Sequence, residues 1–230
     1  HSNVQTKDVV TITGTSSGSL AWNNFAGIIM DDNVINYNSN KYYVNIYVNK
    51  CWSNIYYDSS LINSYLIGIV YNPTYTAADQ TIFVSNCYSI ITHNYRIKIY
   101  SGGDKTFGIL INGNASNCYS VIKGYFASVA LTATSCTIAI GGIAEQRHSN
   151  LTVTNNYCYI KVSGSIQNGT TSSQKAYLSI GGILSSNDTT IKSSNYAVPY
   201  TTDEIKNSLS GTYTLYNYCT TNYVTAITTD

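Results

Sequence analysis

Charge is scarce in this chain of 230 residues. Lys, Arg, Asp and Glu together make up 10% of it, and the formal net charge is +1. Proteins that bind nucleic acids need a basic stripe to neutralise phosphates, so the composition argues against a nucleic-acid partner. No apolar run reaches the roughly 18 residues that suggest a membrane span. We therefore expect neither a nucleic-acid partner nor a membrane span.

Groups that carry acid, base or metal chemistry are also few: the chain has two glutamates, nine aspartates and three histidines. Asp31 and Asp32 resemble the carboxylate pairs of β-helix polysaccharide-degrading enzymes, but adjacent side chains diverge, which favours a solvated turn. Residues 145–148 (Glu-Gln-Arg-His) precede an acceptor asparagine and favour an exposed loop. His93 has no partner within reach by sequence. We expect no catalytic residue, cofactor or metal site, and a polysaccharide-degrading β-helix enzyme is the alternative.

The polar surface must come from uncharged residues, including 26 asparagines and 23 tyrosines. Tyr, Thr, Ile and Val suit the pleated, half-buried surface of strands, while Asn tolerates left-handed backbone angles and bonds its own main chain in turns. Hydrophobic residues make up 43% of the chain, more than disordered segments carry. The composition therefore predicts an all-β protein.

Glycine flanked by branched apolar residues recurs along the chain. The motif is centred on five positions with steps of 41, 40, 34 and 40 residues: Gly27, Gly68, Gly108, Gly142 and Gly182. A unit of this size cannot bury an apolar face alone, so units that recur regularly stack and share one core. The repeat predicts a solenoid, with each glycine at a tight corner where a Cβ would clash.

Within each unit the sequence predicts three strands. The glycine motif opens the first, an Asn-plus-aromatic or cysteine pattern such as 116–119 (Ser-Asn-Cys-Tyr) marks the second, and alternation as in 159–163 marks the third. Loops of variable length connect the units. A β-sandwich adhesin is the architectural alternative.

The succession of Gly-Gly-Ile or Gly-Ile-Leu, then Ser-Asn-Cys-Tyr, then a β-rich stretch returning to the next glycine resembles the GLUG-type repeats of secreted and surface proteins. Residues 200–206 (Tyr-Thr-Thr-Asp-Glu-Ile-Lys) resemble the short helix that often closes such arrays. The resemblance spans about residues 25–209. It implies a right-handed β-solenoid in an adhesin-like protein of the cell surface, and it implies no catalytic residue.

Three of the six cysteines, Cys87, Cys118 and Cys158, recur at similar places in their units. In a solenoid they should form one column, one strand spacing apart. Stacked inward thiols would act as small core hydrophobes. Disulfides are the alternative, and the sequence does not choose among the pairings of Cys51, Cys87, Cys118, Cys136, Cys158 and Cys219.

Two surface features bear on location and partners. Four glycosylation sequons occur, at Asn114, Asn150, Asn168 and Asn187. With low charge and six cysteines they favour an extracellular or cell-surface protein. Tyrosine groups such as Tyr42-Tyr43, Tyr56-Tyr57 and Tyr71/Tyr75 predict ladders on a solenoid face, which either stack structurally or offer flat area to glycans or cell-surface ligands.

The ends of the chain complete the prediction. We expect an N-terminal strand segment or cap at 1–24, solenoid repeats at 25–200, and a closing segment at 201–230 with a short helix near 202–208. Strand-like segments at both ends either cap one molecule or pair between molecules. We expect a right-handed β-helix of about five turns that acts as a non-catalytic structural protein, adhesive or assembled with copies of itself into filaments.

Overall fold

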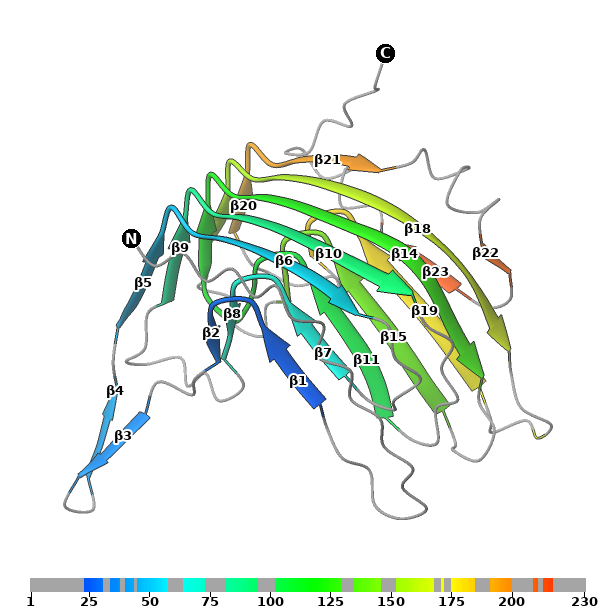
Figure 1. Ribbon diagram of the computed structural model, residues 1–230, viewed down its shortest axis with the longest axis horizontal. Coiled ribbons are helices and arrows are strands. Elements are labelled where there is room, and N and C mark those ends of the chain that lie inside the picture. The colour runs from blue at the N-terminus through cyan, green and yellow to red at the C-terminus, as the bar shows by residue number, and fades with distance from the viewer. Residues whose placement is uncertain are drawn as a thin grey trace.

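A computed structural model gives the fold (Figure 1). It describes residues 23–30, 34–37, 40–43, 45–57, 64–72, 82–94, 102–129, 135–145, 152–167, 171, 175–184, 191–199, 209–210 and 213–216. Across these residues the chain is all-β, and none of them belongs to a helix that could cross a membrane. Four sheets, named A, B, D and E, are built of parallel strands and run the length of the molecule, and a separate hairpin forms sheet C.

Sheets A and B form one side of the structure. Sheet A contains, in spatial order, β1 (Asn23–Ala26), β7 (Ser64–Ile67), β11 (Gly102–Phe107), β15 (Ser135–Gly141), β19 (Lys175–Gly181) and β23 (Tyr213–Tyr216). Sheet B contains β2 (Ile29–Met30), β8 (Val70–Tyr71), β12 (Leu110–Ile111) and β16 (Ala144–Glu145).

Sheets D and E form the other side. Sheet D contains β5 (Ile46–Asn49), β9 (Ile82–Ser85), β13 (Asn114–Ser116), β17 (Thr152–Thr154) and β20 (Ile191–Ser193). Sheet E contains β6 (Trp52–Tyr57), β10 (Tyr88–Asn94), β14 (Tyr119–Val129), β18 (Tyr157–Gln167) and β21 (Tyr196–Pro199), with β22 (Leu209–Ser210) also beside β18. The hairpin of β3 (Val34–Tyr37) and β4 (Asn40–Tyr43) projects from the body.

Each of the first four turns contributes one strand to A, B, D and E in that order, so the expectation of three strands per unit is wrong. In the next turn an isolated bridge from Leu184 to Ala144 takes the place of the strand in sheet B. The sequence pattern missed sheet B because its strands, such as β8 and β12, are two residues long. The strand predicted at 159–163 is part of the longer β18, which runs without a break from Tyr157. The strands pair in parallel with their counterparts in neighbouring turns. An all-β fold with parallel, stacked strands is thus confirmed, and it argues against a sandwich of antiparallel strands.

The recurring glycines occupy the corner between sheets A and B. The amide of Gly68 donates to the Phe107 carbonyl one turn further on, and Gly108 donates in the same way to Gly141. A Cβ built on Gly68 would lie within 3.0 Å of the Gly108 carbonyl oxygen and of the Ser89 side chain. Glycine is required because backbone from the next turn fills the space where a side chain would be.

A second corner joins sheets D and E and uses left-handed backbone angles. The residue that makes this turn has a φ between 51° and 56° in each case: Lys50, Asn86, Asn117, Asn155 and Ser194. Asn is enriched in this conformation because its short amide hydrogen-bonds locally. The abundant asparagine of the sequence therefore has a specific structural use.

The core fills the space enclosed by the four sheets. In β18 alternate residues face inward: Ile160 and Val162 are buried, while Lys161 between them is exposed. A second, smaller cluster of buried residues, Ile67, Tyr71, Phe107 and Ile111, packs separately from the main core. The molecule is therefore held together by apolar columns that extend from turn to turn.

Two predictions concern the end of the chain. The helix expected near 202–208 lies outside the described residues. Residues 213–216, expected to follow the repeat, form β23, whose residues from Tyr213 to Tyr216 pair in parallel with Leu178 to Gly181 of β19. Sheet A thus continues one strand beyond the last glycine corner.

Candidate functional site

A tyrosine ladder lies on the outer face of sheet E. Tyr88 and Tyr119 stack with ring centroids 5.1 Å apart, and Tyr119 and Tyr157 with centroids 5.0 Å apart. Trp52 occupies the same column in the first turn. Burial and the neighbouring Tyr157 and Tyr88 hydroxyls raise the pKa of Tyr119. Because the ring faces cover one another, the interior of this ladder is structural rather than a platform for a flat ligand.

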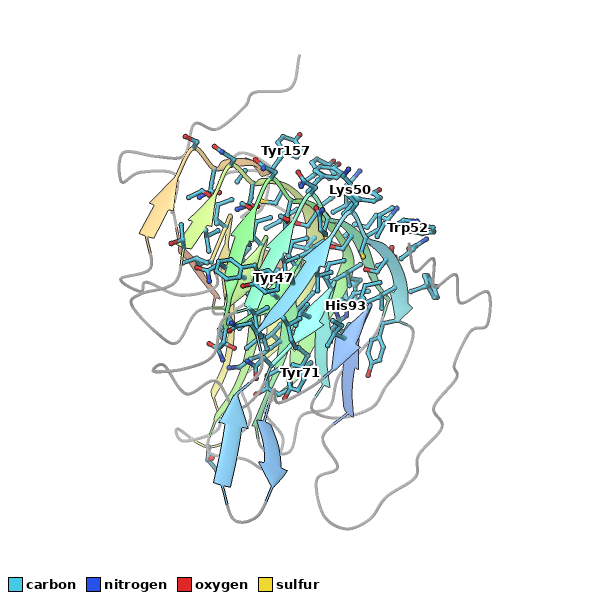
Figure 2. The ribbon with its side chains drawn as sticks, turned by 90° about the vertical axis from the view of Figure 1, so that its left-hand side faces the viewer. Tyr47, Lys50, Trp52, Tyr71, His93 and Tyr157 are labelled. Atoms are coloured by element: carbon cyan, nitrogen blue, oxygen red, sulfur yellow. The ribbon has the colours of Figure 1, made fainter. Side chains whose placement is uncertain are left out.

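A second aromatic pair lies on the outer face of sheet D. Tyr47 and Phe83 stack at 5.2 Å with an interplanar angle of 8°. Tyr47 is 71% exposed and Phe83 39% exposed. Figure 2 views the molecule with the outer face of the first turn toward the viewer and labels three residues of this turn, Tyr47, Lys50 and Trp52. The outermost turn thus carries aromatic rings on two adjoining outer faces.

The tyrosine groups predicted from sequence divide between surface and interior. Tyr56 is exposed, as expected of a ladder, but Tyr57 is buried and contacts His93 edge to face at 5.5 Å. Tyr71 is also buried and packs near Tyr65. The Tyr42 and Tyr43 side chains and all of Tyr75 lie outside the described residues. Alternation along β6 explains the split, since neighbouring residues face opposite sides of a strand.

Among the described residues, the first turn leaves the end of the core incompletely covered. In the part of the chain that the structure describes, the partly buried hydrophobic residues that pack against the main core belong to this turn: Ile28, Ile29, Ile46, Cys51 and Ile55. Their counterparts one turn further on, such as Ile82 and Ile91, are fully buried. Among the described residues, β1, β2, β5 and β6 also have no strand paired to their outer edges. We name this surface the open end.

An amide ladder closes the inside of the D/E corner in the later turns. Asn156 Nδ2 donates to the Ala115 carbonyl and to Asn195 Oδ1, both at 3.0 Å, and Asn156 Oδ1 accepts from the Cys118 amide at 2.9 Å. Asn195 Nδ2 donates to the Val153 carbonyl at 2.7 Å. Both side chains are fully buried, so the ladder satisfies polar backbone that would otherwise be orphaned.

The same column holds thiols in the earlier turns, at Cys51, Cys87 and Cys118. The prediction that Cys158 shares this column is wrong. Cys158 pairs with Ser120, two residues further along sheet E, and its thiol donates to the Gly182 carbonyl at 2.6 Å. Residues 154–157 (Thr-Asn-Asn-Tyr) take the place of 116–119 (Ser-Asn-Cys-Tyr) in that turn, so the cysteine follows two residues later, at the next inward position.

Four described cysteines form no disulfide: Cys51, Cys87, Cys118 and Cys158. The side chains of Cys136 and Cys219 lie outside the described residues. Cys87, Cys118 and Cys158 are buried in the main core, as the small-hydrophobe interpretation expects. A hydrogen bond from the Cys118 sulfhydryl lowers the pKa of Cys87 to about 7. The same hydrogen bond, together with burial, raises the pKa of Cys118.

The acid and base candidates do not converge. His93 is buried, is hydrogen-bonded through Nε2 to Thr106 Oγ1 at 2.8 Å, and has its pKa lowered to about 3 by burial. Glu145 forms an ion pair of 2.6 Å with Lys105, which also lies over the Tyr65 ring. Asp31, Asp32 and residues 146–148 lie outside the described residues. No cluster of three metal-ligating side chains occurs in the described part of the chain.

Asn114 is the one predicted glycosylation site that the structure describes. Its Nδ2 donates to the Ile82 carbonyl at 3.2 Å, and its Oδ1 accepts from the Thr152 amide at 2.9 Å. These bonds tie the amide into sheet D, so a glycan on Nδ2 would have to displace one of them. Asn150, Asn168 and Asn187 lie outside the described residues, and glycosylation at all four positions stays a prediction.

Comparison with known proteins gives no relative: no family model matches the chain, and neither a curated protein nor a solved structure matches it significantly. The resemblance to GLUG-type repeats therefore stays a prediction from the sequence motifs.

Proposed function

We propose that this chain is a non-catalytic structural protein of the cell exterior, secreted or surface-bound. In this proposal it is a right-handed β-solenoid of about five turns that assembles head to tail with copies of itself. Adhesive contacts with glycans or other cell-surface ligands would come from the outer faces of the assembled solenoid. The proposal follows from the stacked parallel architecture and from the composition.

The open end is the observation that carries this proposal. Partly exposed core residues such as Ile46 and Ile55 gather at one end of the stack, beside strands whose outer edges have no described partner. Exposed, apolar edge strands are templates for another chain, and solenoids that remain monomeric cover such ends with a polar cap. An additional turn from another molecule would cover these residues, in the same way that the first turn covers the core residues of the second turn.

A second copy of this chain matches the open end because the turns repeat. The ladder of sheet E begins with Trp52 in the first turn. At the other end of the sheet, Tyr196 of β21 occupies the same strand position, because its backbone pairs with that of Tyr157. A copy placed with its last turn against the open end would continue this column across the junction. The contact is head to tail, so it does not close and generates an open fibre. The formal net charge of +1 offers little repulsion.

A non-catalytic role is supported by how the described ionisable groups are used. Glu145 is held by Lys105, and His93 is enclosed in the core. Two-carboxylate glycoside chemistry needs a facing pair of acids with space for a sugar between them, and the described residues present no such pair. The carboxylates on which the alternative of a polysaccharide-degrading enzyme rests, Asp31 and Asp32, lie outside the described residues.

The test places a charge at the open end. Ile55→Lys introduces a charge where a second molecule would pack, and Asn54→Lys puts the same charge on the exposed outer face of the same strand. We expect the parent chain and Asn54→Lys to form oligomers or filaments by light scattering and negative-stain microscopy, and Ile55→Lys to remain monomeric with unchanged β-rich circular dichroism. Filaments of undiminished length from Ile55→Lys would contradict assembly through this end.

A further inference from the structure

Three cysteines of successive turns lie one above another at the D/E corner. The amide of Tyr88 donates to the Cys51 carbonyl at 3.0 Å, and the amide of Tyr119 donates to the Cys87 carbonyl at 2.9 Å, which fixes Cys51, Cys87 and Cys118 in register. Neighbouring strands lie about 4.8 Å apart. That spacing falls inside the roughly 4.4 to 6.8 Å range of Cα separations found in disulfides.

The three thiols also point the same way. Each donates to the carbonyl two residues earlier: Cys51 to Asn49 at 3.5 Å, Cys87 to Ser85 at 3.2 Å, and Cys118 to Ser116 at 3.3 Å. Parallel Cα–Cβ vectors leave a Cβ separation slightly above the range of about 3.5 to 4.5 Å that a disulfide needs. A shift of roughly half an ångström closes the difference, and among the described strands those of the outermost turn are paired on one side only.

Access to the column comes from the open end. Cys51 is half-buried, whereas Cys87 and Cys118 are each 2% exposed. A small oxidant therefore reaches Cys51 first. Cys87 is the better nucleophile because the hydrogen bond from the Cys118 sulfhydryl lowers its pKa, whereas burial raises the pKa of Cys51. Thiolates rather than thiols attack disulfides.

We propose that Cys51 and Cys87 form an oxidisable dithiol, which a small-molecule disulfide such as oxidised glutathione converts to an intramolecular disulfide joining the first two turns. In the first step the Cys51 thiolate attacks one sulfur of the oxidant, which leaves a mixed disulfide on Cys51 and releases one thiolate. In the second step the Cys87 thiolate attacks Cys51 Sγ and releases the other. Two protein thiols lose two protons and two electrons, and the oxidant becomes two thiols.

The bond would link the first turn, whose described strands are paired on one side only, covalently to the second turn. Terminal elements with few contacts open most readily, and a covalent link from the first turn to the second would oppose that opening. Disulfides persist in extracellular environments, which agrees with the proposed location. The inference concerns the unassembled chain, because a second molecule packed on the open end would also cover Cys51.

The test uses the intact, reduced chain treated with oxidised glutathione near neutral pH. Remaining thiols are alkylated under denaturing conditions and peptides are mapped by mass spectrometry. We expect a linked peptide pair containing Cys51 and Cys87. In Cys87→Ala the reaction should stop with one glutathione on Cys51. In Cys118→Ala the second step should slow roughly threefold, since the higher pKa of Cys87 removes thiolate but makes the remainder more nucleophilic.

A second measurement on the unmodified sequence keeps the proposal testable if a variant fails to fold. Hydrogen exchange of the β6 amides should slow after oxidation and recover after reduction. A link between Cys87 and Cys118 with Cys51 left free would overturn the proposal. So would a treated chain in which Cys51 and Cys87 are both still alkylated, or exchange in β6 that does not respond to the oxidant.

Discussion

Ser89 Oγ donates a hydrogen bond to the carbonyl oxygen of Gly108 one turn further along the stack. Ser53 and Ser120 make the same bond to the carbonyls of Gly68 and Gly142. Each bond crosses the interior from sheet E to the A/B corner and supplies a donor to a buried carbonyl. The serine and the glycine lie against each other, because a Cβ on the glycine would meet the serine side chain.

The first prediction concerns this bond. Ser89→Ala leaves the buried Gly108 carbonyl without its hydroxyl donor, and we expect a loss of about 1 to 3 kcal/mol in the free energy of unfolding, measured by chemical denaturation. The matched control is Ser85→Ala, since Ser85 Oγ bonds to the Asn49 side chain at an exposed position. The control should cost less than about 0.5 kcal/mol. Equal losses in the two variants would show that the interior bond contributes nothing specific.

The second prediction concerns the glycine of the same corner. A Cβ at Gly108 would lie within 3.0 Å of the Gly142 carbonyl oxygen and the Ser120 side chain, and a backbone carbonyl held between turns cannot move aside cheaply. We expect Gly108→Ala to cost about 3 kcal/mol or more. Gly113→Ala, whose Cβ would meet Ile82 at 3.0 Å, should be milder. Thermal melting that gives Gly108→Ala the smaller loss would contradict the close approach.

The sequence predicted the all-β class and the glycine corner because glycine spacing reports a constraint that recurs in every turn. It did not predict sheet B, since two-residue strands such as β8 and β12 carry no periodicity. The position of Cys158 was wrong because Asn156 takes the place of the cysteine in that turn, and Cys158 follows two residues later at the next inward position. The open end could not be predicted from the sequence, because the burial of Ile46 and Ile55 depends on which turn is outermost.

The third prediction is a pH dependence. Burial lowers the pKa of His93 from its ordinary 6.5 to about 3. Between these values the unfolded chain binds a proton that the folded chain excludes, so stability is complete above about pH 6.5 and falls as the pH drops toward 3. The slope for one proton is at most about 1.4 kcal/mol per pH unit.

Denaturation of His93→Gln provides the control for this pH dependence. The variant keeps a group able to bond Thr106 but removes the titration, so its stability should fall less steeply over the same pH interval. The remaining histidines titrate in both proteins and cancel in the comparison. Identical pH profiles for the two proteins would show that His93 is charged in the fold or does not contribute.

The fourth prediction concerns the amide ladder. Asn156→Ala removes the acceptor of the Cys118 amide and the donor to the Ala115 carbonyl, both buried. We expect a loss of about 2 to 4 kcal/mol by chemical denaturation, since each orphaned group costs about 1 to 3 kcal/mol. Asn155→Gly is the control, because Asn155 is exposed and its φ of 53° suits glycine. Equal losses of unfolding free energy in the two variants would show that the amide ladder does not stabilise the fold.

Cryo-electron microscopy of the purified, concentrated chain is the most direct test of head-to-tail assembly. We predict unbranched filaments whose axis follows the stack of turns, with a strand spacing of about 4.8 Å that continues from the last turn of one molecule to the first turn of the next. Trp52 of each copy should lie against the last turn of its neighbour. Isolated monomers at high concentration, or association through the outer faces of the sheets, would contradict the account.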